Sequence, residues 1–227
     1  MERHNFHREL EQLKLTIYKM AALARQSFDN ACKAYLHRDD DIAQAIIDGD
    51  REINRIELEI DRQSLRLLAL EQPMARDLRM IVGIMRISND LERIADQSVN
   101  IAERTVYLCQ HPPLENVPAM EALIDTTKKM LAMAVTSFRD LDAVAAKQIP
   151  AMDDQADEYT MQVLKGLIEV MAASSPGFEK RVLKMRRSIQ TIIISRCLER
   201  IADMSTNIAE HVVFIAEGIN LKHQQKG

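Results

Sequence analysis

The sequence repeats one stretch of thirteen residues almost unchanged. LERIADQSVNIAE occupies residues 91–103 and LERIADMSTNIAE occupies residues 198–210, so the second copy follows the first at an offset of 107 positions. Repeat units of solenoid proteins are only about 20–50 residues long. A unit of 107 residues instead has room for three amphipathic helices that pack antiparallel around one core. We therefore expect the chain to contain the same helical unit twice.

The composition favours helices throughout. Only six Gly and six Pro occur in 227 residues, and aromatic residues make up 4% against 47% for hydrophobic residues overall. No stretch shows the sustained alternation of apolar and polar residues that is typical of strands. Apolar residues instead recur at three- and four-residue spacing, which predicts helices over residues 5–36, 40–71, 74–110, 116–146, 149–173 and 177–218.

The predicted fold is all-α, with six long antiparallel helices forming two tandem, pseudo-symmetric three-helix bundles. The double proline Pro112-Pro113 lies at the middle of the chain and ends the third predicted helix. We therefore expect one bundle in residues 1–112 and the second in residues 113–227.

Charge and sequence patterns exclude several classes of protein. A net charge of −4 gives no overall attraction to nucleic acid or to anionic membranes. The three cysteines lack zinc-ligand spacing, which is typical of reduced thiols in a cytosolic protein. No apolar segment approaches the ~20 residues that a membrane span requires, and no signal peptide is visible. We interpret the chain as a cytoplasmic protein.

The repeated stretch places acidic and amide side chains in one row along a helix. Glu92 and Asp96 are one turn apart, and both border the face that the apolar residues occupy. Two carboxylates at this spacing repel each other, and a multivalent cation would remove the repulsion. Oxygen ligands suit hard cations. The candidate metal-binding rows are Glu92, Asp96, Asn100 and Glu103 in the first copy and Glu199, Asp203, Asn207 and Glu210 in the second.

The helix before each repeated stretch adds further oxygen ligands. Asp50 and Asn54 precede the first copy, and Asp153 and Asp157 precede the second at nearly the same offset. An alternative without metal remains open. Arg93 and Arg200 each lie three residues before an aspartate of the row and could form ordinary surface ion pairs with it.

The chain resembles the PhoU family of bacterial phosphate-transport accessory and regulatory proteins. The resemblance rests on LERIAD followed by NIAE once in each half, together with QPMARDLRMI at residues 72–81. It implies two symmetric three-helix bundles and an acidic metal-binding signature in each, with iron, zinc, magnesium or manganese as possible ions. Glu92/Asp96 and Glu199/Asp203 match that signature. Asn54 stands where an acid is expected, which implies weaker binding in the first bundle.

The resemblance also implies a role. Such a protein is a negative regulator of phosphate uptake and of the phosphate-starvation response. It is not an enzyme but an adaptor between the ATPase of the phosphate ABC transporter and a phosphate-sensing histidine kinase. It reaches the membrane only through these partners. We also expect a homodimer.

Basic residues near the start of two helices are candidates for partner binding. Arg76 and Arg79 open the third predicted helix, and their counterparts open the sixth: Lys180, Arg181, Lys184 and Arg187. The simpler interpretation of each set is a solvated helix face.

Two other functions stay open from the residues alone. A carboxylate-bridged ferroxidase or oxidase would use Glu-x-x-His pairs, but no His in the sequence has a Glu three residues before it. The other alternative is a purely structural helical module.

Overall fold

The computed structural model describes residues 2–49, 51–173 and 177–219. These residues form helices and no strands, which confirms the predicted all-α class. The helices are α1 (Glu2–His37), α2 (Asp40–Gly49), α3 (Arg51–Glu71), α4 (Ala75–Cys109), α5 (Pro118–Asp140), α6 (Ala143–Ala146), α7 (Pro150–Ala172) and α8 (Phe178–Glu217). None of the helices in these ranges meets the length and hydropathy of a membrane span.

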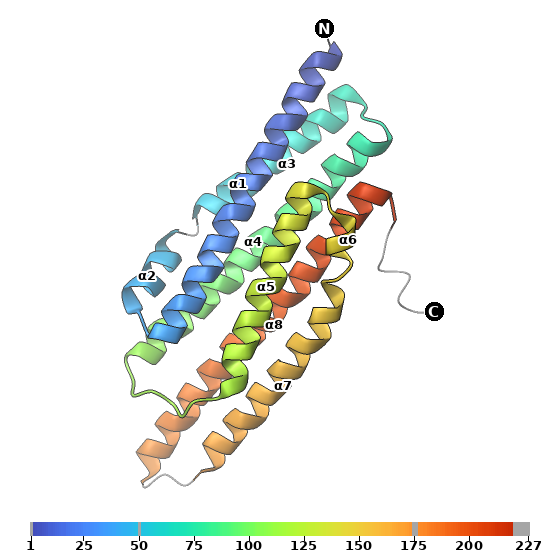
Figure 1. Ribbon diagram of the computed structural model, residues 1–227. Coiled ribbons are helices and arrows are strands. Elements are labelled where there is room, and N and C mark those ends of the chain that lie inside the picture. Colours follow the sequence, from blue (N-terminus) through green and yellow to red (C-terminus); the bar gives the residue numbers. More distant parts are fainter. Residues whose placement is uncertain (1, 50, 174–176, 220–227) are drawn as a thin grey trace.

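The helices pack as two bundles that lie side by side in an elongated molecule (Figure 1). In the first bundle α1 and α4 pack together with α2 and α3, and in the second α5, α7 and α8 pack together with the short α6. Helices α4 and α8 are the main contact between the bundles. They run antiparallel, because Gly83 near the start of α4 lies against Ile215 near the end of α8.

The core follows from the apolar spacing of the long helices. On α1, side chains at three- and four-residue intervals, from Leu13 and Ile17 to Phe28, are completely buried. Phe28 and its counterpart Phe138 on α5 are among the largest buried side chains. Buried hydroxyl groups donate within their own helix. Ser98 donates to the carbonyl oxygen of Ile94 at 2.8 Å, and Ser205 to that of Ile201 at 2.8 Å. These small side chains therefore line helix contacts without an unsatisfied polar group.

The predicted helix 116–146 is wrong in its second part, because α5 ends at Asp140. Leu141 adopts a left-handed conformation with φ 52°, which a helix cannot continue through. Asp142 then starts α6 by accepting hydrogen bonds from the backbone N–H groups of Val144 and Ala145, each at 3.0 Å. An aspartate is a preferred N-cap residue, so Asp142 was the sequence signal for this break.

The predicted helix 40–71 corresponds to two helices, α2 and α3, on either side of position 50. The metal-ligand candidate Asp50 lies outside the described residues.

Candidate functional site

The second bundle brings four of the predicted acidic residues together. Asp153 and Asp157 lie one turn apart on α7, and Glu199 and Asp203 lie one turn apart on α8. The two helices pack against each other through buried residues such as Ala156 on α7. The carboxylates therefore lie at the border of this contact, where they are partly removed from water.

Asp153 shows the strongest effect of this environment. Burial is the main cause that raises its pKa to about 6, and the negative charges of Asp203 and Asp157 raise it further. A hydrogen bond from Thr206 on α8 acts in the opposite direction. Asp153 is thus held next to α8 in a site that disfavours its ionised form.

The pKa of Asp203 is also raised, first by burial and then by the charges of Asp157 and Glu199. Arg200 and Arg93 act against this rise. The pKa of Asp157 is raised by burial and by Glu199. The four carboxylates therefore form one electrostatic cluster, which we call the α7–α8 acidic cluster, and each of the three aspartates is disfavoured as an anion.

One arginine partly neutralises the α7–α8 acidic cluster. Arg196 donates to a carboxylate oxygen of Glu199 at 2.5 Å, one turn before it on α8. The same arginine lowers the pKa of Asp157, although burial and neighbouring acids outweigh its effect. This arginine was not among the predicted ion-pair partners of the acidic row, which were Arg93 and Arg200.

The first bundle has a related but different acidic cluster. Burial raises the pKa of Glu57 on α3, and the charges of Asp61 and Asp96 raise it further. Asp96 belongs to the predicted row, whereas Glu57 and Asp61 were missed by the sequence analysis. Their signal was the spacing on α3: Glu57 follows Asn54 by three residues and Asp61 follows Glu57 by four. We call Asn54, Glu57, Asp61, Glu92 and Asp96 the α3–α4 acidic cluster.

Other members of the predicted rows have different contacts. Asn100 donates its amide to the backbone carbonyl oxygen of Asp96 at 3.0 Å. Glu103 is exposed and lies 3.5 Å from the guanidinium of Arg104. Asn207 points across to α4, and Glu210 is half-buried further along α8. The rows are therefore continuous along each helix but do not act as one set of ligands.

Asp90 on α4 is the residue that Asn207 contacts, and it is 5% exposed. The amide of Asn207 lies 3.4 Å from one carboxylate oxygen, and Nε2 of His211 lies 3.4 Å from the other. Arg93 lies 4.0 Å away on the same helix. Asp90 is thus a buried acid that joins α4 to α8, and sequence analysis missed it because its partners are more than 100 residues away in the chain.

The oxygen ligands suit a hard cation in chemical type, but they do not form a ready-made site. Within residues 2–49, 51–173 and 177–219, no group of three or more His, Cys, Asp or Glu side chains is arranged so that it could hold a metal ion. The carboxylates are close enough to shift each other's pKa, yet they do not converge on one point.

Two of the predicted partner-binding residues hold the connector between α4 and α5. Lys184 is buried and lies 3.1 Å from Glu115. Arg187 donates to the carbonyl oxygens of Pro112 at 2.5 Å and Pro113 at 3.1 Å. Their contacts are therefore internal, although a partner-binding role was predicted for both.

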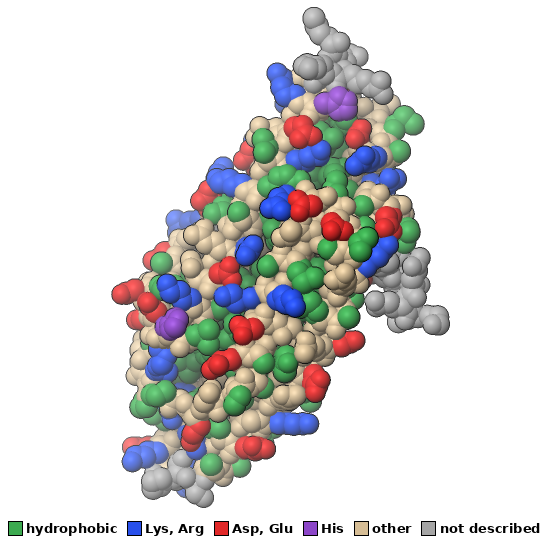
Figure 2. Space-filling view, in the orientation of Figure 1, with side chains coloured by type: hydrophobic (Ala, Val, Ile, Leu, Met, Phe, Trp, Pro, Cys, Tyr) green, Lys and Arg blue, Asp and Glu red, His purple; other side chains and the backbone are tan. Residues whose placement is uncertain are grey.

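The remaining basic candidates lie at two opposite ends of the molecule. Arg76 on α4 and Lys180 and Arg181 on α8 are exposed, while Arg79 is half-buried beside Gly218. Because α4 and α8 are antiparallel, their N-terminal ends point in opposite directions (Figure 1). The two sets therefore cannot form one basic patch. The face formed by α1 and α5 likewise carries interspersed acidic and basic side chains (Figure 2).

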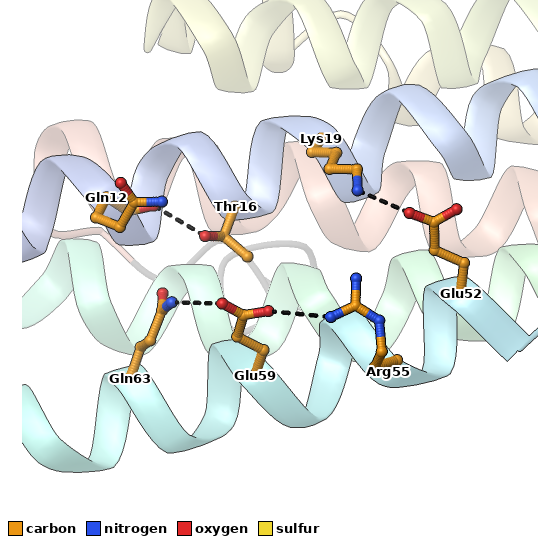
Figure 3. Close-up of polar contacts among 7 residues, drawn as sticks. All are labelled: Gln12, Thr16, Lys19, Glu52, Arg55, Glu59 and Gln63. Atoms are coloured by element: carbon orange, nitrogen blue, oxygen red, sulfur yellow. Dashed lines mark hydrogen bonds and ion pairs between the residues drawn. The ribbon is translucent and has the colours of Figure 1, made fainter.

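On the side of α3 that faces α1, acidic side chains have basic or amide partners (Figure 3). Lys19 on α1 donates to Glu52 at 2.7 Å, and Glu59 lies 3.6 Å from Arg55. Gln63 also donates to Glu59, at 3.1 Å. This pairing contrasts with the side of α3 that faces α4, where acidic residues raise the pKa of Glu57.

The comparisons with known proteins agree with one another. The PhoU domain model matches residues 17–105 and again residues 120–212. A phosphate-specific transport system accessory protein PhoU homolog of Aquifex aeolicus is 35% identical over 96% of this chain and 95% of its own length. The crystal structure of PhoU from Pseudomonas aeruginosa superposes with a TM-score of 0.87 at 30% identity and covers 94% of this chain and 100% of that one. The phosphate transport system regulatory protein PhoU from Streptococcus pneumoniae gives a TM-score of 0.84 at 28% identity, covering 95% and 98%.

Proposed function

The chain belongs to the PhoU family, and from this premise we propose that it is an accessory and regulatory protein of phosphate-specific transport. The observation that carries the proposal is the match over nearly the whole chain to relatives named as accessory proteins of that system. The duplicated fold supports it further, since two bundles joined along α4 and α8 present two similar outer faces. The proposed role is that of an adaptor that binds other proteins and not that of an enzyme.

The partners that we propose are the ATPase of a phosphate ABC transporter and a phosphate-sensing histidine kinase. The protein would act in the cytoplasm and reach the membrane only through them, restraining uptake and the starvation response when phosphate is ample. Its net charge of −4 fits protein partners better than nucleic acid.

This proposal is tested by capture from cells grown with ample phosphate and from phosphate-starved cells. We expect the tagged protein to retain the transporter ATPase and the kinase, and deletion of its gene to raise expression of phosphate-starvation genes in ample phosphate. Normal repression after deletion, together with capture of neither partner, would contradict the adaptor role. Size-exclusion chromatography with light scattering on the same protein measures whether it is the expected homodimer.

We further propose that a hard cation binds at the α7–α8 acidic cluster. The support is electrostatic, because a cation would remove the repulsion that raises the pKa values of Asp153, Asp157 and Asp203. Since no three ligands converge, binding requires these side chains to move together. The first bundle offers Asn54 where the second has Asp157, and we expect weaker binding there.

Elemental analysis of untagged protein, followed by equilibrium dialysis with Mg²⁺, Mn²⁺, Fe³⁺ and Zn²⁺ separately, tests cation binding. We expect Asp153→Asn with Asp203→Asn to lower the bound metal while the circular dichroism stays helical. An equal metal content in this variant would rule out the site. Oxygen consumption with ferrous iron tests the ferroxidase alternative directly.

A further inference from the structure

Exposed apolar side chains recur at equivalent positions of the two bundles. Leu58 and Leu65 on α3 are 69% and 58% exposed, and Met161 and Ile168, which follow them at an offset of 103 residues on α7, are 49% and 52% exposed. Leu78 on α4 and its counterpart Met185 on α8 are also exposed. Single exposed apolar residues need no explanation, but the same set in both halves describes a surface that was duplicated with the fold.

These side chains are continuous with the acidic clusters. Leu78 precedes Asp96 by eighteen residues, and Met185 precedes Asp203 by the same number. Eighteen residues are about five helical turns, so the two members of each pair lie on the same line of the helix, about 27 Å apart. Leu58 and Leu65 are separated by about two turns and also share one line, on the neighbouring helix α3.

Each bundle therefore has a face that changes character along its length. Near the turn that joins the two helices the face is apolar, and toward the middle of the molecule it becomes acidic. We call these the docking faces. The first comprises Leu58, Leu65, Leu78, Glu57, Asp61 and Asp96, and the second comprises Met161, Ile168, Met185, Asp157, Glu199 and Asp203.

The charge on the acidic part of each docking face exceeds its local neutralisation. Burial and neighbouring acids raise the pKa values of Glu57, Asp157 and Asp203 despite the arginines close to α7 and α8. By contrast, the acids on the α1 side of α3 are paired (Figure 3). A partner that brings positive charge to the docking faces would relieve this repulsion.

We infer that each docking face binds one amphipathic helix of a partner protein, with apolar anchors at one end and Arg or Lys side chains at the other. The apolar anchors pack on the leucine or methionine side chains and the basic side chains lie over the acids, which fixes the direction of the helix. A helix of about 18 residues matches the ~27 Å length of the face. The duplication provides two such sites in each chain. This inference rests on the proposed adaptor function and specifies how a partner docks.

The same charges exclude other occupants of the docking faces. A second copy of this chain would bring one acidic cluster against another, which is unfavourable. An anionic lipid surface and nucleic acid carry the same sign of charge as the faces and are disfavoured for the same reason.

A synthetic helical peptide of 20 residues tests the inference on the full chain. The probe has Leu at three- and four-residue spacing in its first half and Arg on the same face in its second half, and a second peptide has Glu in place of each Arg. By fluorescence anisotropy and titration calorimetry, we expect the basic probe to bind at two sites per chain. We expect the acidic peptide to bind at least ten times more weakly, and the affinity of the basic probe to fall as salt rises.

Matched variants locate the binding. Leu65→Ser with Ile168→Ser removes one exposed anchor from each docking face, and we expect a tenfold or greater loss of affinity for the basic probe. The control is Leu15→Ser with Val144→Ser, which changes residues of similar exposure on α1 and α6. Circular dichroism checks that both variants remain folded, which their exposed positions favour.

The inference is overturned if the two peptides bind equally, if both variant pairs lose the same affinity, or if only one site is found per chain. The outcome is separable from that of the adaptor function. Capture of the transporter ATPase that is unaffected by Leu65→Ser with Ile168→Ser would refute the docking faces and leave the adaptor role standing. Binding of the probe without capture of either cellular partner would do the reverse.

Discussion

Asp153 is the residue in which the electrostatics of the site are most visible. Its pKa of about 6 in the folded protein, raised mainly by burial, lies above the ordinary aspartate value of 3.8. An acid whose folded-state pKa is raised favours the folded state when protonated and disfavours it when ionised. This part of the stability is therefore present at low pH and is lost as the pH rises from about 4 through about 6.

We expect Asp153→Asn to increase the free energy of unfolding at pH 7.5, where the wild-type side chain is ionised. The gain should be about 1 kcal/mol, after allowance for solvent screening of a half-exposed group. Near pH 4.5 the gain should nearly vanish, because the wild-type carboxyl is then largely protonated. Urea denaturation at both pH values measures the difference, with the exposed Asp125→Asn as the control. A gain that does not depend on pH would show that the shift in pKa is not its source.

Asp90 has a structural role at the same scale, because it offers a buried carboxylate to side chains of the other bundle. We expect Asp90→Ala to lower the free energy of unfolding by about 1–3 kcal/mol, since Asn207 and His211 lose a charged acceptor. A double-mutant cycle with His211→Ala should give a coupling energy of about 0.5–3 kcal/mol. Additive effects of the two changes would show that the 3.4 Å contact contributes nothing to stability.

At the scale of the helices, the approach of α4 to α8 depends on Gly83. A Cβ atom at this position would lie 2.4 Å from Cδ1 and Cγ1 of Ile215, a completely buried side chain. Alanine is favoured over glycine in a helix by about 1 kcal/mol, but crowding in a packed core costs about 1–3 kcal/mol. The crowding is the larger effect here, because Ile215 has no open space into which it can turn.

We therefore expect Gly83→Ala to lower the melting temperature, and Gly83→Ala combined with Ile215→Ala to lower it by less than the sum of the single changes. Gly49→Ala is the matched control, since a Cβ atom there would meet nothing within 4 Å. Calorimetry of the four variants decides between the two effects. A higher melting temperature for Gly83→Ala would mean that α4 and α8 can separate at little cost.

At the scale of the whole molecule, one arginine from each bundle holds the connector between the bundles. Arg38, in the first bundle, donates to the carbonyl oxygens of Leu108, at 2.5 Å, and of His111. Arg187, in the second, donates to those of Pro112 and Pro113. The connector is therefore fixed to both bundles, which limits how far they can move relative to each other.

We expect Arg38→Ala with Arg187→Ala to make the connector, residues 110–117, a site of rapid proteolysis while the helical circular dichroism is retained. Backbone carbonyls that lose a charged donor open to solvent more often. Limited proteolysis with mass spectrometry identifies the cleaved bonds, and Arg181→Ala, an exposed residue of α8, is the control. Unchanged cleavage would show that the α4–α8 contact alone holds the bundles in place.

The sequence alone indicated much of this fold because the relevant signals are local. Apolar spacing defined the long helices, and the offset of 107 residues between the repeated stretches indicated two equivalent bundles. The acidic pairs on α7 and α8 were also predicted correctly as neighbours, because residues four apart share one face of a helix. These features follow from helix geometry and require no knowledge of what packs against what.

The tertiary structure decided the contacts between helices that are distant in the chain. It brought Glu57 and Asp61 to Asp96, directed Asn207 to Asp90 on the other bundle, and turned Lys184 and Arg187 toward the connector. Periodicity gives the face of a helix on which a side chain lies but not the neighbour that this face meets. That neighbour is set by the antiparallel packing of α4 on α8, in which residues more than 100 positions apart come into contact.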